Sequence, residues 1–240
     1  MKELDACIDA YHNDFDYAFD NNIILNWYPQ RILSRVSRNN NALELGIGHG
    51  FTSNHFSNYF SKHSVIDGSH AIIKKFRQEY PNSKAQLIQS YFENFESSIQ
   101  FDVLIMGFVL EHVNDPAHIL KRFKKFISPK GRCFIAVPNG EALNRRFGYE
   151  AGLLPDLSAL GEGDKALGHQ RLYTVDSLTT QLQECGYRVI SKEGIFLKPL
   201  TTKQLISLDL SKDIIQAMCK VGINYPELSV GLFFEVELVK

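Results

Sequence analysis

Short apolar runs alternate with segments of helical periodicity along most of this chain. The apolar runs predict strands at residues 42–45, 64–67, 84–89, 101–106, 133–137, 187–191 and 231–239. Apolar side chains that recur every three or four residues predict helices between them, at residues 51–60, 71–80, 116–127 and 176–185. Several strands are apolar enough to be buried on both faces, as parallel strands are. Strands that alternate with helices across short connections predict an α/β fold with a doubly wound, mostly parallel sheet.

The same alternation extends along the chain, so we expect a single domain over residues 1–240. Residues 1–40 predict a helical lead-in, in which an aromatic-rich helix ends at Pro29. Residues 138–174 and 195–230 break the alternation, and the first of them is too long for a plain connection in a compact domain. We therefore expect lid-like insertions on the substrate side at both places, with one or two helices in the second.

Composition argues against several classes of partner. The chain of 240 residues has a formal net charge of −1, so no surplus of basic residues indicates a nucleic acid. The four cysteines are scattered, with no pair spaced for zinc or redox chemistry, which indicates reduced thiols in the cytoplasm. No stretch is long and apolar enough to span a membrane, and the acidic start lacks the apolar core of a signal peptide. We expect a cytoplasmic protein that binds neither nucleic acid nor membrane, and the oligomeric state stays open.

A glycine-rich turn follows the first predicted strand. Gly46, Gly48 and Gly50 come at alternate positions directly before the helix that begins near Phe51. Glycine permits positive φ angles and close approach of the backbone, so this turn can lie against a ligand. The N–H groups at the start of the helix would favour a carboxylate or phosphate group. A tight turn without any ligand is the alternative interpretation.

Two carboxylates help to decide between the cofactor classes that such a turn accommodates. Asp67 ends the second strand, where it could accept both hydroxyl groups of a ribose, and a helix cap is the simpler alternative. The dinucleotide fingerprint requires a third glycine where this chain has Phe51. Glu44 would also be unfavourable beside a pyrophosphate, whereas it suits an ammonium group or a positively charged sulfonium. The turn therefore favours a sulfonium cofactor over a nicotinamide dinucleotide.

Five segments then fall in a recognisable order and spacing, namely Leu43–Gly50, Val65–Asp67, Phe101–Met106, Leu110–Pro116 and Gly131–Pro138. Together they resemble the class I S-adenosylmethionine-dependent methyltransferases, and most nearly the small-molecule branch that includes the ubiquinone-pathway O-methyltransferases. The resemblance implies a Rossmann-like sheet of seven strands in the order 3-2-1-4-5-7-6, with the seventh strand antiparallel. It also implies S-adenosyl-L-methionine as the cofactor, S-adenosyl-L-homocysteine as its product, and a small molecule as the methyl acceptor.

The resemblance further implies a set of cofactor contacts after the strand ends. Ser90 and Tyr91 would lie at the adenine edge, although Ser90 departs from the acid or amide that the family often has there. Gly107 and Phe108 would line the methyl-transfer channel, and Glu44 would lie near the amino group of the methionyl part. The complete set of implied cofactor-binding residues is Glu44, Gly46, Gly48, Gly50, Asp67, Ser90, Tyr91, Gly107 and Phe108.

Methyl transfer to a hydroxyl group also requires removal of its proton. His112, after the fourth strand, and His169, in the first insertion, are the candidate bases. Each has a structural alternative, since His112 could tie its helix to a neighbouring loop and His169 could lock the lid. We expect no bound metal because no cluster of carboxylates stands out, while Asp115 and Asn139 stay open as ligands.

The insertions are expected to supply the acceptor pocket. An oxygen nucleophile on a small molecule is favoured, because the place after the fourth strand lacks the Asp- or Asn-Pro-Pro-aromatic motif of enzymes that methylate bases. Basic and aromatic side chains in the insertions would suit a polar or anionic acceptor such as a sugar; they are Arg145, Arg146, Tyr149, Arg171 and Lys198. Two competing functions are an NAD(P)-dependent oxidoreductase and a non-catalytic protein of the same fold that binds the cofactor or assists assembly.

Overall fold

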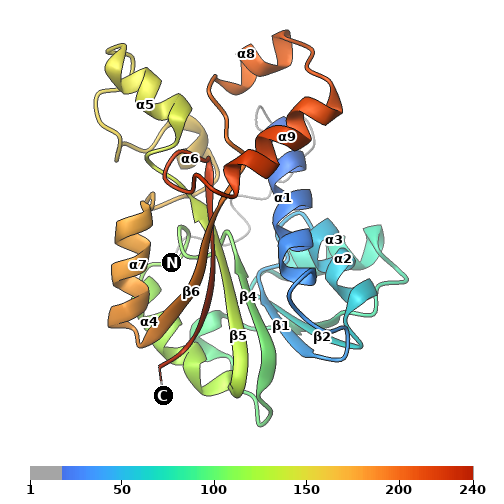
Figure 1. Ribbon diagram of the computed structural model, residues 1–240. Helices are drawn as coiled ribbons and strands as arrows, with labels where there is room; N and C mark the ends of the chain where they lie inside the picture. The colour runs from blue at the N-terminus through green and yellow to red at the C-terminus, as the bar shows by residue number, and fades with distance from the viewer. Residues whose placement is uncertain (1–17, 240) are drawn as a thin grey trace.

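The computed structural model describes residues 18–239, which contain a seven-stranded sheet with helices on both faces (Figure 1). The strands are β1 Asn41–Leu45, β2 Lys62–Asp67, β3 Gln86–Gln89, β4 Phe101–Gly107, β5 Ile127–Pro138, β6 Tyr187–Ile195 and β7 Gly231–Leu238. Their order is β3-β2-β1-β4-β5-β7-β6, which confirms both the predicted order and the α/β class. Strands β1 to β5 pair in parallel, whereas β7 runs antiparallel to β5 and β6.

The helices between the strands divide between the two faces of the sheet. They are α1 Ala18–Leu33, α2 Phe51–Tyr59, α3 His70–Glu79, α4 Pro116–Phe123, α5 Leu143–Glu150, α6 Glu162–Ala166, α7 Val175–Glu184, α8 Thr202–Ser207 and α9 Lys212–Gly222. On one face α1, α2, α8 and α9 form a core that contains Tyr28, Phe56 and Leu205. On the other face α4 and α7 bury Leu120 and Leu178 against the strands. Apolar surface removed from water on both sides holds the layers together.

The lead-in differs from its prediction at Pro29. Helix α1 continues through this proline to Leu33. A proline inside a helix costs one backbone hydrogen bond. Here, however, Pro29 lies on the buried face of the helix together with Tyr28 and Ile32, and burial of these side chains offsets the loss. The part of the lead-in before residue 18 lies outside the described residues.

Two strands are longer than the sequence predicts. Strand β5 begins at Ile127, because the polar segment 128–131 forms an irregularity within the strand where its register to β4 shifts. Strand β6 continues to Ile195 by pairing with β7 along its second half. The second half of β6 contains polar residues such as Glu193, because an edge strand need not be apolar on both faces. The pattern of apolar residues therefore did not predict this half.

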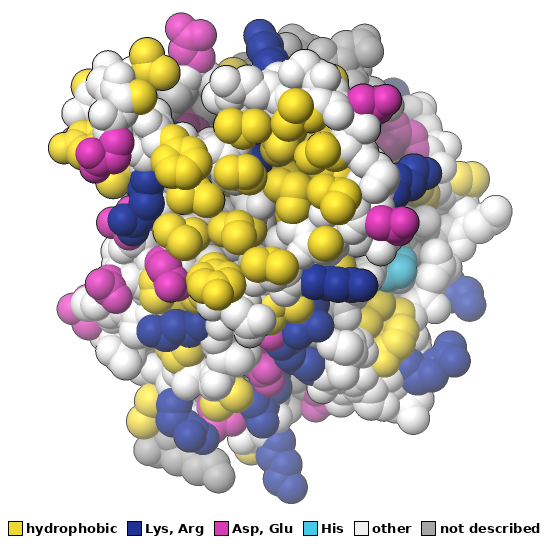
Figure 2. Space-filling view, turned by 45° about the horizontal axis from the view of Figure 1, so that its top comes forward, with side chains coloured by type: hydrophobic (Ala, Val, Ile, Leu, Met, Phe, Trp, Pro, Cys, Tyr) yellow, Lys and Arg dark blue, Asp and Glu magenta, His cyan; other side chains and the backbone are white. Residues whose placement is uncertain are grey.

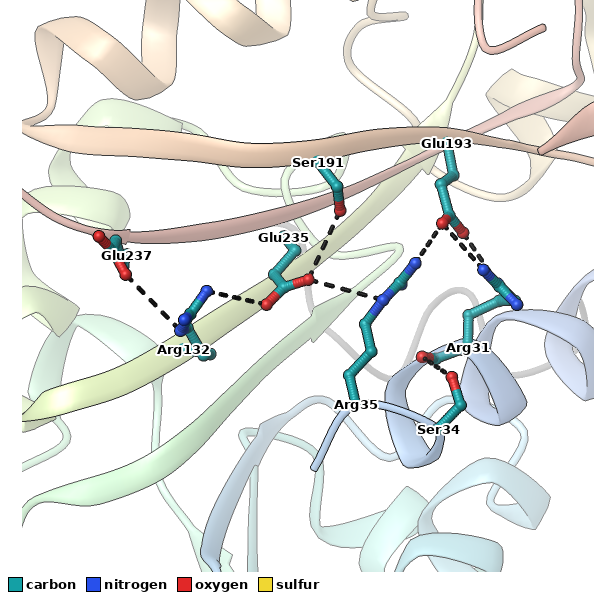
Figure 3. A network of polar contacts seen from close by, with 8 residues as sticks. All are labelled: Arg31, Ser34, Arg35, Arg132, Ser191, Glu193, Glu235 and Glu237. Carbon is teal, nitrogen blue, oxygen red and sulfur yellow. Dashed lines mark hydrogen bonds and ion pairs between the residues drawn. The ribbon is translucent and has the colours of Figure 1, made fainter. Parts of the chain in front are cut away.

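A network of ion pairs fixes α1 across β6 and β7 (Figure 3). Arg31 donates hydrogen bonds of 2.9 Å to both carboxylate oxygens of Glu193, and Arg35 contacts the same carboxylate. Arg35 Nε also lies 3.5 Å from Oε2 of Glu235, which accepts a hydrogen bond of 3.0 Å from Arg132 through its other oxygen. Because Glu193 is mostly shielded from water, an alternative position of the helix would leave its carboxylate without Arg31 and Arg35. The network therefore fixes the position of α1, and with it the position of the Tyr28 side chain in the core.

The two predicted insertions lie beyond the carboxyl ends of the central strands, in the upper part of Figure 1. The first contains α5 and α6, and the second contains α8 and α9. Lys198 of the second insertion is buried and donates hydrogen bonds to Asp20 of α1 and to Thr202 of α8. This buried contact attaches the second insertion to the N-terminal helix. The function of both insertions as substrate-side lids stays a prediction.

The part of the chain between residues 18 and 239 includes no helix that combines the length and the apolar character needed to cross a bilayer. Within the same range Cys133, Cys185 and Cys219 are free thiols, and all three are buried. Burial raises the pKa of the Cys133 and Cys219 thiols, so these groups are unreactive near neutral pH. Their state agrees with the expectation of reduced cysteines, while Cys7 lies outside the described residues.

Candidate active site

The glycine turn connects β1 to α2 near the centre of the sheet. Gly46, Gly48 and Gly50 have φ angles of +79°, +54° and +85°, in the left-handed region that side chains disfavour. A Cβ atom at Gly50 would lie 3.0 Å from the ring of Phe76 in α3, so helix packing requires glycine there. Among residues 18–239, a Cβ atom at Gly48 would meet no atom within 4 Å. As far as these residues are concerned, the backbone at Gly48 therefore faces open space that a ligand can approach.

Asp67 lies at the carboxyl end of β2, beside this turn. Its Oδ2 accepts a hydrogen bond of 2.9 Å from the Ile47 N–H, and its Oδ1 accepts one of 2.8 Å from the Ser69 N–H. The cap of α3 is the Ser69 side chain, which accepts from the Ile72 N–H, so the simple cap interpretation of Asp67 does not hold. Asp67 thus braces the glycine turn through two backbone N–H groups, and its contact with the hydroxyls of a ribose stays a prediction.

Ser90 and Tyr91 follow β3 and lie next to Asp67. The Ser90 N–H donates a hydrogen bond of 3.1 Å to the Asp67 carbonyl oxygen. The Ser90 hydroxyl donates to the carbonyl oxygen of Tyr91, and the Tyr91 side chain is half exposed. This position beside the ribose acid is compatible with the adenine edge of a nucleoside, and the contact itself stays a prediction.

Glu44 is buried behind the turn. Its Oε2 lies 3.2 Å from Nε2 of His63 on β2, and both side chains are almost fully shielded from water. The two atoms lie within ion-pair distance, and neither of them has a hydrogen-bond partner among the described residues. The sequence assigned no role to His63. The predicted proximity of Glu44 to the amino group of a cofactor remains untested by these contacts.

Backbone strain marks the end of β4. Phe108 has a φ angle of +57°, which costs a bulky side chain about 1–3 kcal/mol and is typical of functional sites. Its ring packs edge-on against Tyr28 of α1, with ring centroids 5.8 Å apart. A Cβ atom at Gly107 would collide with the Tyr28 hydroxyl, so this close approach requires glycine. Burial raises the pKa of Tyr28, and the negative charges of Glu44 and Glu111 add to the effect. Tyr28 is therefore a neutral hydroxyl at the floor of the site.

Ionisable side chains from two distant segments converge above the end of β4. Nδ1 of His169 lies 3.0 Å from Oδ1 of Asp164. The rings of His112 and His169 are 4.8 Å apart between centroids and meet at 72°. Among the described residues, Glu111, His112 and His169 also offer one possible ligand atom each, and these three atoms lie within 4.8 Å of one another. The structure therefore brings both predicted bases together and adds two carboxylates to them.

Hydrogen bonds to the backbone hold the two segments in place. The Gln170 N–H donates to the Glu111 carbonyl oxygen at 2.8 Å, and the Gln170 side chain donates to the His112 carbonyl oxygen at 2.7 Å. The Arg171 guanidinium donates to three further carbonyl oxygens of the same loop, those of Leu110, Val113 and Asn114. Because Arg171 is committed to the loop, it serves as a structural clamp and not as the acceptor contact that the sequence suggested.

Burial governs the pKa values of this cluster. It raises the pKa of Glu111 to about 7 and lowers the pKa of His112 to about 4, where the charge of His169 adds to the effect. Burial also acts to raise the pKa of Asp164, but hydrogen bonds from His169 and from the Gly161 N–H outweigh it, so that this pKa is lowered. Near neutral pH the cluster thus holds an ionised Asp164, a neutral His112 and a Glu111 that exchanges its proton.

Glu111 should make the stability of the protein depend on pH. Its pKa is raised from 4.5 to about 7, so the folded chain binds this proton more tightly than the unfolded chain. The free energy of unfolding should therefore fall as the pH rises from about 4.5 to 7, by on the order of 3 kcal/mol in metal-free buffer. Glu111→Gln should remove this part of the dependence, which denaturant unfolding at pH 5 and pH 8 measures. The exposed Glu150→Gln should keep the wild-type difference, and an unchanged difference in Glu111→Gln would contradict the assignment.

Two arginines of the first insertion, Arg145 and Arg146, make their bonds within it. Arg145 donates to the carbonyl oxygens of Gly140 and Leu157 at 2.9 Å, and Arg146 pairs with Glu141 at 3.0 Å. The surface that the insertions present is instead largely hydrophobic, as Figure 2 shows. Exposed apolar side chains on it include Phe147, Tyr149, Ile206, Leu208, Ile214 and Val221. Arg145 and Arg146 are thus engaged by neighbouring groups, and the anionic acceptor stays a prediction.

The two residues left open as metal ligands have structural roles. Asp115 caps α4 by accepting a hydrogen bond of 2.9 Å from the His118 N–H. Asn139 is buried and donates to backbone carbonyl oxygens, including that of Ser229 at 2.8 Å. The sequence analysis assigned no role to Glu111 or to Asp164. Glu111 adjoins His112 after a buried strand, which is the signal that could have singled it out, whereas the partnership of Asp164 with His169 needed the structure.

The sheet order, the glycine turn and the acid after β2 together define a Rossmann-like fold of the class I methyltransferase type. A family model described as a methyltransferase domain matches residues 24–192. This chain therefore belongs to the methyltransferase domain family, and its assignment to the class I S-adenosylmethionine-dependent methyltransferases is confirmed. S-adenosylmethionine, the cofactor class that the resemblance implied, is confirmed with it.

A ubiquinone biosynthesis O-methyltransferase from Parvibaculum lavamentivorans is 32% identical over 114 residues. The match spans 45% of this chain and 42% of that protein, so the chain covers less than half of the relative's length.

Solved structures share the fold at low sequence identity. The N-methyltransferase NodS from Bradyrhizobium japonicum, in complex with S-adenosyl-L-homocysteine, has a TM-score of 0.60 at 13% identity over 98% of each chain. The 1,6-didemethyltoxoflavin-N1-methyltransferase from Burkholderia thailandensis has a TM-score of 0.64 at 13% identity, covering 97% of this chain and 85% of the other. These likenesses support the fold and do not specify the acceptor.

Proposed function

We propose that this protein transfers the methyl group of S-adenosylmethionine to an oxygen atom of a small molecule. The observation that carries the choice of oxygen is the His169–Asp164 pair beside the buried Glu111. An amine offers a lone pair once it is neutral, whereas a hydroxyl is a weak nucleophile until its proton leaves. A histidine oriented by a carboxylate is suited to accept that proton. The partial likeness to a protein named as an O-methyltransferase agrees with this choice.

The residues around the glycine turn fit the cofactor. The space beside Gly48 admits a ligand, and the position of Asp67 allows bonds to ribose hydroxyls. When bound, the cofactor supplies a methyl group that a positively charged sulfur has already activated. The protein then has to align the acceptor, exclude water and receive a proton. In this proposal Phe108 and Tyr28 form the wall between cofactor and acceptor, and Nε2 of His169 receives the hydroxyl proton while Asp164 orients the ring.

The acceptor side favours a molecule with apolar surface. Arg145, Arg171 and Lys198 of the insertions donate to groups of the protein, and the exposed face of the insertions is hydrophobic (Figure 2). We place this reaction in the cytoplasm, in line with the free thiols. The sequence also offered a nicotinamide oxidoreductase and a non-catalytic assembly protein, which serve as controls in the tests below.

Two measurements test the proposal. S-adenosylhomocysteine at about 100 times its Kd should stabilise the protein by about 2.7 kcal/mol in thermal or denaturant unfolding, and NAD or NADP should have no such effect. Transfer of labelled methyl groups should then occur to hydroxyl acceptors in a panel that also contains amines of matched size. Stabilisation by NAD alone would overturn the cofactor. Methylation confined to amines would overturn the oxygen acceptor, and binding without any transfer would favour an assembly role.

A further inference from the structure

The cluster contains a carboxylate that is completely buried. The Glu111 side chain is fully shielded from water, and neither of its carboxylate oxygens has a hydrogen-bond partner among the described residues. An ionised carboxylate in such a place costs several kcal/mol unless a proton, a cation or hydrogen bonds compensate it. Because the surrounding hydrogen bonds go to the backbone of Glu111 and not to its side chain, these oxygens are available to a ligand.

Two imidazoles face the same position. The possible ligand atoms of Glu111, His112 and His169 lie within 4.8 Å of one another. Ligand atoms around one tetrahedral zinc ion are about 3.4 Å apart, so movements of about 1 Å by side chains complete such a set. Two histidines and one carboxylate are typical ligands of first-row divalent transition metals, whereas Mg²⁺ prefers oxygen ligands alone. Three protein ligands also leave a coordination position open, as in catalytic metal sites.

The surroundings already contain the support that metal-bound histidines require. Nδ1 of His169 is bonded to Asp164 at 3.0 Å, and Oδ2 of Asp164 accepts a hydrogen bond of 2.8 Å from the Gly161 N–H. A carboxylate on one ring nitrogen fixes the orientation of the imidazole and leaves the other nitrogen to the metal. The bonds from Gln170 and Arg171 to the loop that carries Glu111 and His112 hold the two segments in register.

We infer that Glu111, His112 and His169 bind one divalent transition-metal cation, of the class of Zn²⁺ or Mn²⁺, with Asp164 as the outer partner of His169. The inference rests on the proposed function, because the open position is the place for the acceptor oxygen. A cation there lowers the pKa of a hydroxyl that coordinates it, so the hydroxyl proton can leave to water. With the cation bound, His169 acts as a ligand, and the metal replaces the imidazole in stabilising the deprotonated oxygen.

Metal binding to the full-length chain tests the inference directly. After dialysis against a chelator, Zn²⁺ should bind at one site per chain in titration calorimetry, and Co²⁺ should give an absorption spectrum of nitrogen and oxygen ligation. Glu111→Gln and His169→Gln should abolish this site. Asp164→Asn should weaken it by about 10–100-fold, the effect usual for an outer partner. His118→Ala, which changes an exposed histidine of α4, should bind as the wild type does. Circular dichroism and S-adenosylhomocysteine affinity show that each variant is folded.

The outcomes separate this inference from the proposed function. No stoichiometric binding, binding that survives both Glu111→Gln and His169→Gln, or a cobalt spectrum of thiolate ligation would overturn the metal site. If methyl transfer to hydroxyls resists chelators while it depends on His169, the proposed function stands with His169 as the base and the metal site falls. If the metal binds as expected but hydroxyl acceptors are not methylated, the site stands and the proposed oxygen acceptor falls.

Discussion

His169→Ala is expected to lower kcat by about 10²–10⁴-fold, which is the usual contribution of a side chain that acts in general acid–base catalysis. Affinity for S-adenosylhomocysteine should stay unchanged, because His169 belongs to the segment that packs on the loop after β4 and not to the glycine turn. The expectation holds whether the imidazole accepts the hydroxyl proton itself or holds a cation that replaces it. Steady-state kinetics with a methylated hydroxyl acceptor and calorimetry with the product cofactor measure the two quantities.

Variants of Asp164 and His118 are the controls for the kinetics of His169→Ala. Asp164→Asn keeps the size of a side chain that orients His169, so it should lower kcat less than His169→Ala does and should shift the pH profile of kcat. A side chain that merely held the loop would change stability without moving the pH profile. His118→Ala should leave kcat at the wild-type value. An unchanged kcat in His169→Ala, or an equal loss of cofactor affinity and turnover, would remove His169 from the chemistry.

Asp67→Ala is expected to weaken cofactor binding by about 1–3 kcal/mol, or about 5- to 150-fold in Kd, which is the scale of lost charge-assisted hydrogen bonds. The carboxylate lies beside the glycine turn and holds its Ile47 N–H, so the loss would combine missing ribose contacts with a less ordered turn. Calorimetric titration with S-adenosylhomocysteine measures the affinity. An unchanged Kd would exclude Asp67 from the cofactor site.

Asp102 serves as a control that separates an effect on cofactor binding from an effect on the stability of the fold. Asp102 accepts hydrogen bonds of 3.0 Å from the Asn41 N–H and from the Ser128 hydroxyl, but it does so at the opposite end of β1 and β4. Asp102→Ala should therefore reduce stability in denaturant unfolding without weakening the cofactor. If both variants reduced affinity to the same degree, the effect of Asp67→Ala would reflect the stability of the sheet and not contact with a ribose.

Three basic side chains with structural roles show that a positive charge in a loop is not by itself evidence of substrate binding. Arg145, Arg171 and Lys198 occur in segments without regular periodicity, where a basic side chain resembles a substrate contact. In the structure all three donate hydrogen bonds to other groups of the protein, and they thereby hold neighbouring segments in place. An irregular loop has no repeating backbone hydrogen bonds, so charged side chains commonly supply them.

The family resemblance implied the sheet order, whereas the residues themselves determined the alternation of strands and helices, the glycine turn and the position of the acid after β2. These features depend on local physics, because apolar runs, glycine conformations and strand ends follow from residues that are neighbours in the chain. His112 and His169 could also be singled out, since each belongs to a segment placed at the same edge of the sheet. The family resemblance linked these local signals into one fold, which the strand order confirmed.

The tertiary structure alone decided the partners. Collision of a Cβ at Gly107 with Tyr28, convergence of His112 with His169 and burial of the Glu111 carboxylate all arise from packing between segments far apart in the sequence. Burial, and hence the shifted pKa of Glu111, is a property of everything packed around a side chain. Periodicity reports which face of an element is buried, but it carries no information on which distant atoms meet there. The chemistry of this site is therefore set by packing, on a frame that the local pattern of residues specifies.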